Sequence, residues 1–493
     1  MRRNGGRDDP DAPLRKKTEE YFGKDGGNDA ESYGSAADRR RNAADLERRQ
    51  AESDGDNAEH RGPIGPCERN AFLDIADDAG DRESERCGED DSEEEVPPLQ
   101  HAVRDQKPGQ KECRGEDNDA INARKKVREE CFFHGRMMCY NGSNNHIIKN
   151  LMDIQKLRAT AAEMMVEGKG LLAMDESTPS CNKRFAEYGI PETEAARRDW
   201  RDLIITTPGL GSYVSGAILY DETIRQKKLD GTPFVDALRA EGIIPGIKVD
   251  AGAKDMAGFP GEKLTEGLDG LAARLQEYAG MGARFAKWRA VIRIGDGIPT
   301  QGCIDANTHM LARYAAVCQE AGIVPMVEPE VLMDGDHTIE RCAEVTENVL
   351  RTLFGQLALQ NVDVSGIILK PNMVLAGKDC PVQPGIEETA DATVNCFLKV
   401  VPPQVPGIAF LSGGQSGELA AARLNAMNVR FKGKMPWTLT FSYSRAIQYP
   451  ALGIWSGKAE NVAAAQKALL HRAHCNSAAR RGEYNDSIEQ GTE

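Results

Sequence analysis

Apolar and polar positions follow two different rhythms along residues 150–484. Short apolar runs, rich in branched residues and typical of buried strands, occur at residues 170–175, 215–221, 244–250, 284–290, 323–330, 366–370, 407–414 and 437–445. Between most of them, apolar residues recur at helical spacing, over residues 197–205, 268–278, 306–320, 339–358, 386–399 and 418–427. A further amphipathic helix is expected between residues 150 and 168.

Eight strands that alternate with helices over roughly 300 residues predict an α/β fold, the (β/α)8 TIM barrel. A doubly wound open sheet is the alternative, but its first strand would lead into a Gly-x-Gly-x-x-Gly turn. Gly168-Lys-Gly170 does not supply that turn. We therefore expect a barrel domain over residues 149–484 and a short C-terminal tail over residues 485–493.

Residues 1–148 have a different composition, rich in Asp, Glu, Arg, Asn and Gly and poor in large apolar residues. Within them, residues 89–95 form a run of like charge, Glu-Asp-Asp-Ser-Glu-Glu-Glu. Such a segment cannot bury enough apolar surface to offset the entropy that is lost on ordering. We expect a disordered acidic extension.

The formal net charge of −15 arises mostly in this extension, because residues 51–100 hold about 17 acidic and 4 basic side chains. An acidic chain is poorly suited to bind a phosphate backbone, so nucleic acid is not expected as a partner. The sequence has no run of about 18 apolar residues, so no membrane span is expected. Its first residues have neither the apolar region of a secretory signal nor the acid-poor composition of a transit peptide.

The cysteines and histidines are scattered without the spacing of a metal site. Cys131 and Cys139, followed by His134 and His146, do not match the short Cys-x-x-Cys spacing of zinc ligands. Free thiols in a reducing compartment are the simpler interpretation. We expect no metal and no other cofactor.

Most of the predicted strands end in charged residues. The set comprises Asp175, Lys248, Asp250, Lys287, Arg289, Glu328, Glu330 and Lys370. Residues two apart in a strand point to the same face, which groups Lys287 with Arg289, and Glu328 with Glu330. In a TIM barrel the carboxyl ends of the strands carry the catalytic groups. A buried ion-pair network is the structural alternative.

Lys370 ends the apolar run that begins at Gly366, and Pro371 stops the strand. Desolvation at the mouth of an apolar strand favours the neutral amine of a lysine. A neutral amine can attack a carbonyl group and form a Schiff base. A lysine that only extends its charge from a strand end into solvent is the alternative.

Three segments have the composition of anion sites. Ser412-Gly-Gly414 follows the seventh strand and Ser442-Tyr-Ser-Arg445 follows the eighth, the places where barrel enzymes often bind phosphate. Residues 176–180, Glu-Ser-Thr-Pro-Ser, follow the first strand together with Lys183 and Arg184. The sequence therefore favours a substrate with a phosphate at each end.

These segments resemble class I fructose-1,6-bisphosphate aldolase. The motifs that carry the resemblance, in chain order, are Gly-Lys-Gly-Leu-Leu-Ala-Met-Asp-Glu-Ser (168–177), Gly-Ile-Lys-Val-Asp (246–250), Phe-Ala-Lys-Trp-Arg (285–289), Val-Glu-Pro-Glu (327–330), Leu-Lys-Pro-Asn (369–372) and Phe-Leu-Ser-Gly-Gly-Gln-Ser (410–416). The resemblance runs from about residue 150 to 484. Residues 206–211, 234–239 and 400–407 look most like the plastid branch of plants and algae.

The resemblance implies a role for each site residue. Lys370 resembles the Schiff-base lysine, Glu328 the general acid/base of the iminium stage, and Asp175 the acid that takes the C4-hydroxyl proton. Lys287 and Glu330 resemble supporting charges that tune Lys370. One phosphate site is implied for Ser412, Gly413, Gly414, Ser442 and Arg445, and the other for Ser177, Ser180, Lys248, Arg184 and Arg289.

The reaction implied is the reversible cleavage of fructose 1,6-bisphosphate into dihydroxyacetone phosphate and glyceraldehyde 3-phosphate. The protonated imine serves as the electron sink, so no metal is needed. The resemblance further implies a homotetramer. It favours the plastid stroma, where sedoheptulose 1,7-bisphosphate would be a second substrate, while the composition of the N-terminus favours the cytoplasm.

Two positions depart from the family pattern. Family members usually end in a flexible tail whose terminal tyrosine assists a proton transfer, whereas here Tyr484 lies where the last core turn is expected to end. Slower proton exchange on the triose phosphate is the expectation. Ser444 stands where many members have glycine, and serine suits the site unless the backbone there needs a positive φ.

Two other functions remain open at this point. One is an aldolase-like scaffold that binds a partner through its acidic extension, residues 1–148. The other is a Schiff-base barrel lyase that acts on substrates with a single phosphate.

Overall fold

The structure, a computed structural model, describes the backbone of residues 144–492 and the side chains of residues 153–492. The expectation of a disordered extension over residues 1–148 falls almost entirely outside the described residues. The main helices are α4 (Asn144–Met164), α5 (Thr178–Glu187), α6 (Glu194–Ile205), α7 (Asp221–Arg225), α8 (Phe234–Ala240), α9 (Leu271–Met281), α10 (Gln301–Glu320), α11 (Ile339–Leu359), α12 (Ile386–Val400), α13 (Gly417–Arg430), α14 (Arg445–Trp455), α15 (Val462–Arg481) and α16 (Asp486–Gln490).

Eight parallel strands close into a barrel in the order β1-β10-β9-β8-β7-β6-β3-β2. They are β1 (Gly170–Ala173), β2 (Val214–Leu219), β3 (Ile244–Lys248), β6 (Phe285–Ile292), β7 (Val324–Val331), β8 (Ile368–Leu369), β9 (Gly407–Phe410) and β10 (Thr438–Tyr443). The barrel closes where Leu171 of β1 pairs with Ser442 of β10. The predicted TIM barrel and each of its eight strands are confirmed.

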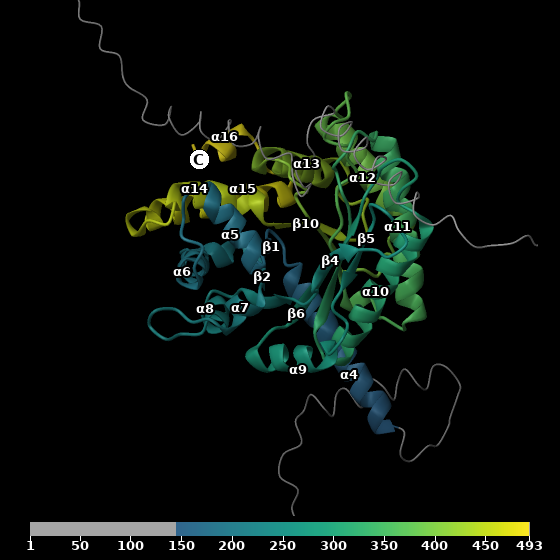
Figure 1. Ribbon diagram of the computed structural model, residues 1–493, viewed down its shortest axis with the longest axis horizontal. Helices are drawn as coiled ribbons and strands as arrows, with labels where there is room; N and C mark the ends of the chain where they lie inside the picture. The colour runs from purple at the N-terminus through teal and green to yellow at the C-terminus, as the bar shows by residue number, and fades with distance from the viewer. Residues whose placement is uncertain (1–143, 493) are drawn as a thin grey trace, which may run out of the picture. The chain divides into compact units, whose positions relative to one another are not determined.

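Helices surround the strands, with α10, α11 and α12 on one side of the barrel and α5, α6, α7 and α8 on another (Figure 1). Hydroxyl side chains begin several of them. Thr300 caps α10 and Ser416 caps α13, each accepting a backbone N–H three residues on. Because helices cover the outside of the barrel, most strand residues are buried whichever face they point to, which explains the largely apolar runs.

Helix α4 packs against the end of the barrel where the strands begin. Leu157, Ala161 and Met164 of α4 form one apolar cluster with strand residues that include Leu171 and Phe285. A glycine at a strand start makes room for this layer, because a Cβ on Gly407, the first residue of β9, would overlap the Met165 side chain. This end of the barrel is filled with apolar side chains, so the polar strand ends are left at the opposite end.

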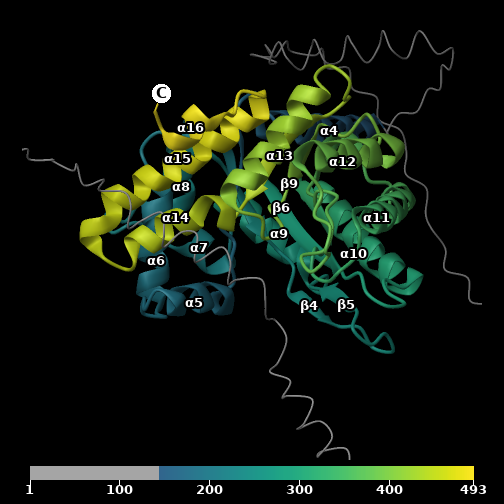
Figure 2. The ribbon, with the colours of Figure 1, turned by 90° about the horizontal axis from the view of Figure 1, so that it is seen from above.

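Some elements were not predicted from the sequence. A hairpin of β4 (Gly252–Asp255) and β5 (Lys263–Glu266) protrudes after β3, as Figure 2 shows. Its residues are mostly exposed, so they lack the apolar run of a barrel strand. Helix α15 is rich in alanine and buries polar side chains such as Asn476, so its apolar stripe is weak. Residues 485–493, expected as a tail, contain α16.

Within residues 144–492, no helix is long and apolar enough to cross a membrane.

Candidate active site

Lys370 lies at the barrel mouth directly after β8. Although β8 ends at Leu369, the backbone N–H of Lys370 still donates to the carbonyl oxygen of Val327 at 2.8 Å, so the ladder to β7 continues through it. Pro371 then ends the strand because it has no N–H to donate. The Lys370 side chain is therefore held on a rigid strand end, and the residue is only 3% exposed.

Four buried charges form a chain across the mouth: Asp175 and Lys370 lie just after β1 and β8, whereas Lys287 and Glu328 lie inside β6 and β7, which continue past the predicted strand ends. Lys370 Nζ lies 3.3 Å from Glu328 Oε1, and Lys287 Nζ lies 3.4 Å from Glu328 Oε2. Lys287 Nζ also lies 2.7 Å from Asp175 Oδ2. Each carboxylate thus has an ammonium neighbour, which reduces the cost of burying the charges together.

The pKa shifts show which of these groups keep their charge. Burial raises the pKa of Asp175, but the ammonium groups of Lys287 and Lys370 outweigh it and hold this pKa below its ordinary value. Burial lowers the pKa of Lys287, but Asp175 and Glu328 outweigh it and hold this pKa above its ordinary value. Asp175 is therefore a carboxylate and Lys287 an ammonium near neutral pH.

Glu328 Oε2 is buried and accepts no hydrogen bond from the described residues, although Lys287 lies within ion-pair distance. The long 3.4 Å separation places this contact at the weak end of hydrogen-bond geometry. The oxygen is thus available to a group that enters the mouth, as a general acid or base requires.

Glu330 pairs with Arg289, whose Nε lies 2.5 Å from Glu330 Oε2. The Arg289 side chain is 43% exposed, whereas Lys287 two residues earlier is buried. Lys248 pairs with Asp250 and also donates to the Asp250 carbonyl oxygen at 2.9 Å. Arg289 and Lys248 therefore each have a carboxylate partner.

The turn after β9 has the backbone of an anion site. Gly413 has φ of 58° and Gly414 has φ of 86°, the left-handed region in which other residues are strained. Ser412 is buried beside them, and Ser442 Oγ is buried without a hydrogen-bond partner among the described residues. Arg445 begins α14 and forms no ion pair within residues 153–492. These groups are unsatisfied donors that a phosphate can use.

The loop after β1 is organised around Glu176, a residue for which the sequence pattern predicted no role. Its carboxylate lies 2.5 Å from Arg184 Nη1 and 2.7 Å from Arg201 Nη2. Ser444 Oγ donates to it at 2.5 Å and Gln448 Nε2 at 2.9 Å. Burial raises the pKa of Glu176, but the two guanidinium groups outweigh it and hold this pKa well below its usual range.

The Glu176 network joins the two segments that were predicted to hold phosphates. The predicted site residues Ser177 and Ser180 lie on the loop after β1 and at the start of α5, with their Oγ atoms 3.1 Å apart. Ser444 adopts φ of −108°, so this position does not need a positive φ, and its side chain also accepts from Arg184 at 3.3 Å. No local signal marks this network, because Glu176 and Ser444 are 268 positions apart.

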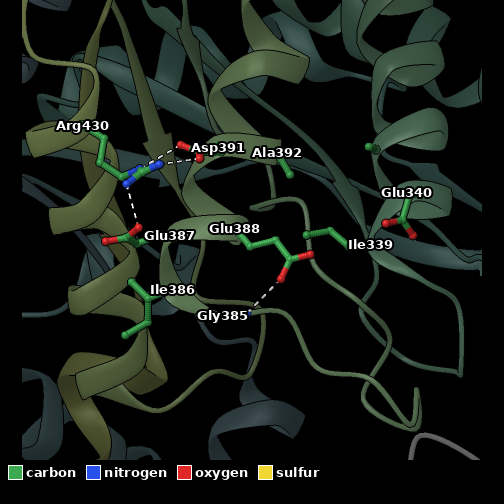
Figure 3. Close-up of a pocket in the computed structure, with 10 residues that line it drawn as sticks. Ile339, Glu340, Gly385, Ile386, Glu387, Glu388, Asp391, Ala392 and Arg430 are labelled. Atoms are coloured by element: carbon green, nitrogen blue, oxygen red, sulfur yellow. Dashed lines mark hydrogen bonds and ion pairs between the residues drawn. The ribbon is translucent and has the colours of Figure 1, made fainter.

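A separate cleft of about 820 Å³ lies on the outer layer, between α11, α12 and α13 (Figure 3). It is lined by Ile339, Glu340, Ala343, Gly385, Ile386, Glu387, Glu388, Asp391, Ala392 and Arg430. Figure 3 shows Arg430 held by Asp391 and Glu387. Its volume suits a small molecule, but it contains none of the strand-end charges. The chemistry lies at the barrel mouth instead.

Among residues 153–492, no group of three or more His, Cys, Asp or Glu side chains is arranged to hold a metal ion.

Comparison with known proteins matches residues 156–493 to the family model "Fructose-bisphosphate aldolase class-I". The "Probable fructose-bisphosphate aldolase class 1" of Xanthomonas axonopodis pv. citri is 56% identical over 334 residues, 68% of this chain and 99% of the relative. The cytosolic fructose-bisphosphate aldolase 4 of Arabidopsis thaliana is 49% identical over 336 residues, 68% of this chain and 85% of the relative.

A solved structure of fructose-bisphosphate aldolase from Plasmodium falciparum, in complex with TRAP and a small-molecule inhibitor, is 47% identical with a TM-score of 0.67. That match covers 68% of this chain and 96% of the Plasmodium chain. The fold, the family model and the relatives agree over the same residues. The chain belongs to the class I fructose-bisphosphate aldolase family.

Proposed function

We propose that this chain catalyses the reversible cleavage of fructose 1,6-bisphosphate into dihydroxyacetone phosphate and glyceraldehyde 3-phosphate, with Lys370 as the Schiff-base nucleophile. The observation that carries the proposal is the buried Lys370 amine, 3.3 Å from a carboxylate at the mouth of the barrel. The family of the chain supports the substrate and the reaction.

The first half of the reaction builds the imine. Lys370 must lose a proton before its nitrogen can attack the C2 carbonyl of the open-chain sugar, and Glu328 Oε1 is within reach to accept that proton. Loss of the C2 oxygen as water then needs an acid, and the same carboxyl can return the proton. Glu328 therefore acts as acid and base in turn, and the product is a protonated imine between Lys370 and C2.

The second half breaks the carbon–carbon bond. Asp175, kept ionised by Lys287, takes the proton of the C4 hydroxyl. The C4–O bond becomes a carbonyl, the C3–C4 bond breaks, and its electron pair moves into the imine to give an enamine. Glyceraldehyde 3-phosphate leaves, after which protonation of C3 and hydrolysis release dihydroxyacetone phosphate. Lys287 stabilises the negative charge of both carboxylates throughout, and Glu330 holds Arg289 at the rim.

The two phosphate sites differ in whether their donor side chains already have partners. Arg445 and Ser442 are unpaired donors beside the Ser412–Gly414 turn, whereas Arg184, Lys248 and Arg289 are paired with carboxylates. This difference also suits a second candidate function, cleavage of sugars with a single phosphate. A comparison of kcat/KM for fructose 1,6-bisphosphate and fructose 1-phosphate separates the two, because a preference for the monophosphate would contradict the second phosphate site.

Borohydride trapping with dihydroxyacetone phosphate tests the nucleophile. Reduction of the imine should attach the triose covalently to Lys370 in the wild type, and peptide mass spectrometry should locate it there. The Lys370→Ala variant should trap nothing. No adduct on the wild type, or equal trapping on the variant, would show that the assignment is wrong.

The compartment and the assembly state belong to the same proposal. The Xanthomonas and Arabidopsis relatives are a bacterial and a cytosolic plant protein, so they lend no support to the plastid branch that the motifs favoured, and we favour the cytoplasm. Fractionation with plastid and cytosol markers distinguishes the two compartments. We also propose a homotetramer, the assembly that the family resemblance implies, and light scattering of the purified chain measures it. The relatives do not support the scaffold alternative.

A further inference from the structure

A second cation lies beside the phosphate turn. A Cβ placed on Gly414 would lie 3.4 Å from Arg445 Nη2 and 3.7 Å from both Nζ and Cε of Lys378. The guanidinium of Arg445 and the ammonium of Lys378 therefore both lie close to the same position beside Gly414. The family motifs in the sequence did not point to Lys378.

The backbone holds Lys378 firmly in this place. Gly377, Lys378 and Asp379 donate their backbone N–H groups to carbonyl oxygens within residues 333–337, at 2.8, 2.8 and 2.9 Å. Gly377 cannot carry a side chain, because a Cβ there would overlap a carbonyl oxygen of the facing segment. The backbone of Lys378 is thus fixed by hydrogen bonds between residues 377–379 and residues 333–337. Its side chain is 25% exposed.

The partner of Lys378 is easily displaced. Its Nζ lies 3.0 Å from Asp334 Oδ1, and the Asp334 side chain is 53% exposed. Ion pairs in such wet surroundings contribute little, because water and salt screen them. A dianion bound at the turn would offer Lys378 a stronger charge than Asp334 does, and a lysine stem is flexible enough to exchange partners.

The groups around the Ser412–Gly414 turn favour an anionic ligand. Ser442 Oγ is buried with no partner among the described residues, and Ser442 lies near the end of β10, three residues before Arg445. Gly413 and Gly414 adopt positive φ angles that let the backbone approach a ligand closely. A phosphate that satisfies these donors would lie within reach of Lys378.

We propose that Lys378 binds the phosphate held by Ser412–Gly414, Ser442 and Arg445, and that Asp334 competes with this phosphate for Lys378. The inference rests on the proposed function and adds a specificity residue to it. A second donor with full charge, beside Arg445, favours a dianionic phosphate ester over a neutral or singly charged group. Asp334 serves as the counter-ion of Lys378 while the site is empty.

Two substitutions with opposite expected effects on phosphate binding test this exchange of partners. Lys378→Gln should raise KM for fructose 1,6-bisphosphate, and the inhibition constant of inorganic phosphate, by about three- to tenfold, as loss of one charged donor does. Asp334→Asn should lower both constants, because Lys378 is then free for phosphate. Lys399→Gln removes a lysine that pairs with Glu347 on the outer layer at 3.2 Å, and it should leave both constants unchanged.

A purely structural role for the Lys378–Asp334 pair would make both substitutions act in the same direction. The proposal is therefore overturned if Lys378→Gln leaves both constants at the wild-type value, or if Asp334→Asn weakens phosphate binding as much as Lys378→Gln. Calorimetric titration of inorganic phosphate into the same proteins needs no turnover. It keeps this test separate from the proposed function, which fails if the wild type neither traps nor cleaves its substrate.

Discussion

The ammonium of Lys287 lies 2.7 Å from the carboxylate of Asp175, although their strands β6 and β1 are separated by β3 and β2 in the barrel. The ion pair therefore spans the mouth instead of linking neighbouring strands. Both side chains are almost fully buried, so water cannot solvate one charge if the other is removed. The catalytic charges consequently contribute to the stability of the barrel as well as to its chemistry.

Replacement of Lys287 by methionine should destabilise the fold by about 3–5 kcal/mol, since Asp175 and Glu328 are left buried with less compensation. Urea unfolding measures the change. The Lys287→Met/Asp175→Asn double variant should lose less than the sum of the single variants, because it leaves no orphaned carboxylate at Asp175. Arg341→Met breaks an exposed pair with Glu344 and should cost less than about 1 kcal/mol. Additive losses in the double variant would contradict the coupling.

The stability of the protein should fall in acid, partly through Glu176. Its pKa is lower in the folded protein than its ordinary value of 4.5, so the stability it contributes is complete above that value and is lost as pH falls below it. Glu176→Gln cannot titrate, so this variant should be less stable than the wild type at pH 7 but should lose less stability between pH 5 and pH 3. Unfolding at a series of pH values measures both curves, and parallel curves would contradict the prediction. Glu344→Gln, at an exposed site, is the control.

Alanine at Gly414 should impair phosphate binding beyond its effect on stability. The residue has φ of 86°, so a side chain is strained there by roughly 1–2 kcal/mol. The added methyl group would also stand beside Arg445 and Lys378, where the phosphate is proposed to bind, and should raise KM about tenfold, equivalent to ~1.4 kcal/mol.

Gly433 provides the matched control for this substitution. It also has a positive φ, of 73°, but a Cβ there meets no atom within 4 Å. Gly433→Ala should show a similar loss of stability with an unchanged KM. Equal KM values for both alanine variants would place the phosphate elsewhere.

The sequence was sufficient to predict features that repeat along the chain, such as the barrel strands, and features marked by neighbouring residues, such as the position of Lys370. Each barrel strand is mostly buried and so leaves a short, largely apolar run, and Lys370 could be placed because Pro371 marks the end of its strand. The β4–β5 hairpin left no such run, because its residues face solvent. Helix α15 escaped prediction because alanine and buried polar residues blur its apolar face.

Contacts between residues far apart in the sequence limited how much of the site could be predicted. Asp175, Lys287 and Glu328 could be grouped because strand ends of a barrel share one mouth. The partner of each charge depends on the exact position of side chains from different strands. The Glu176–Ser444 contact and the approach of Lys378 to Gly414 follow only from the closed barrel, as does the pairing of Glu330 with Arg289.

The closure of the barrel between β1 and β10 also sets when the site can exist during synthesis. Glu176 leaves the ribosome 268 residues before its partner Ser444, which takes roughly 15–50 s at usual elongation rates. Throughout that interval the hydrogen-bonding edge of β1 has no β10 to pair with, and the Glu176 carboxylate lacks both Ser444 and Gln448. The nascent chain must therefore protect an open strand edge until its last strand emerges, and the phosphate site forms only then.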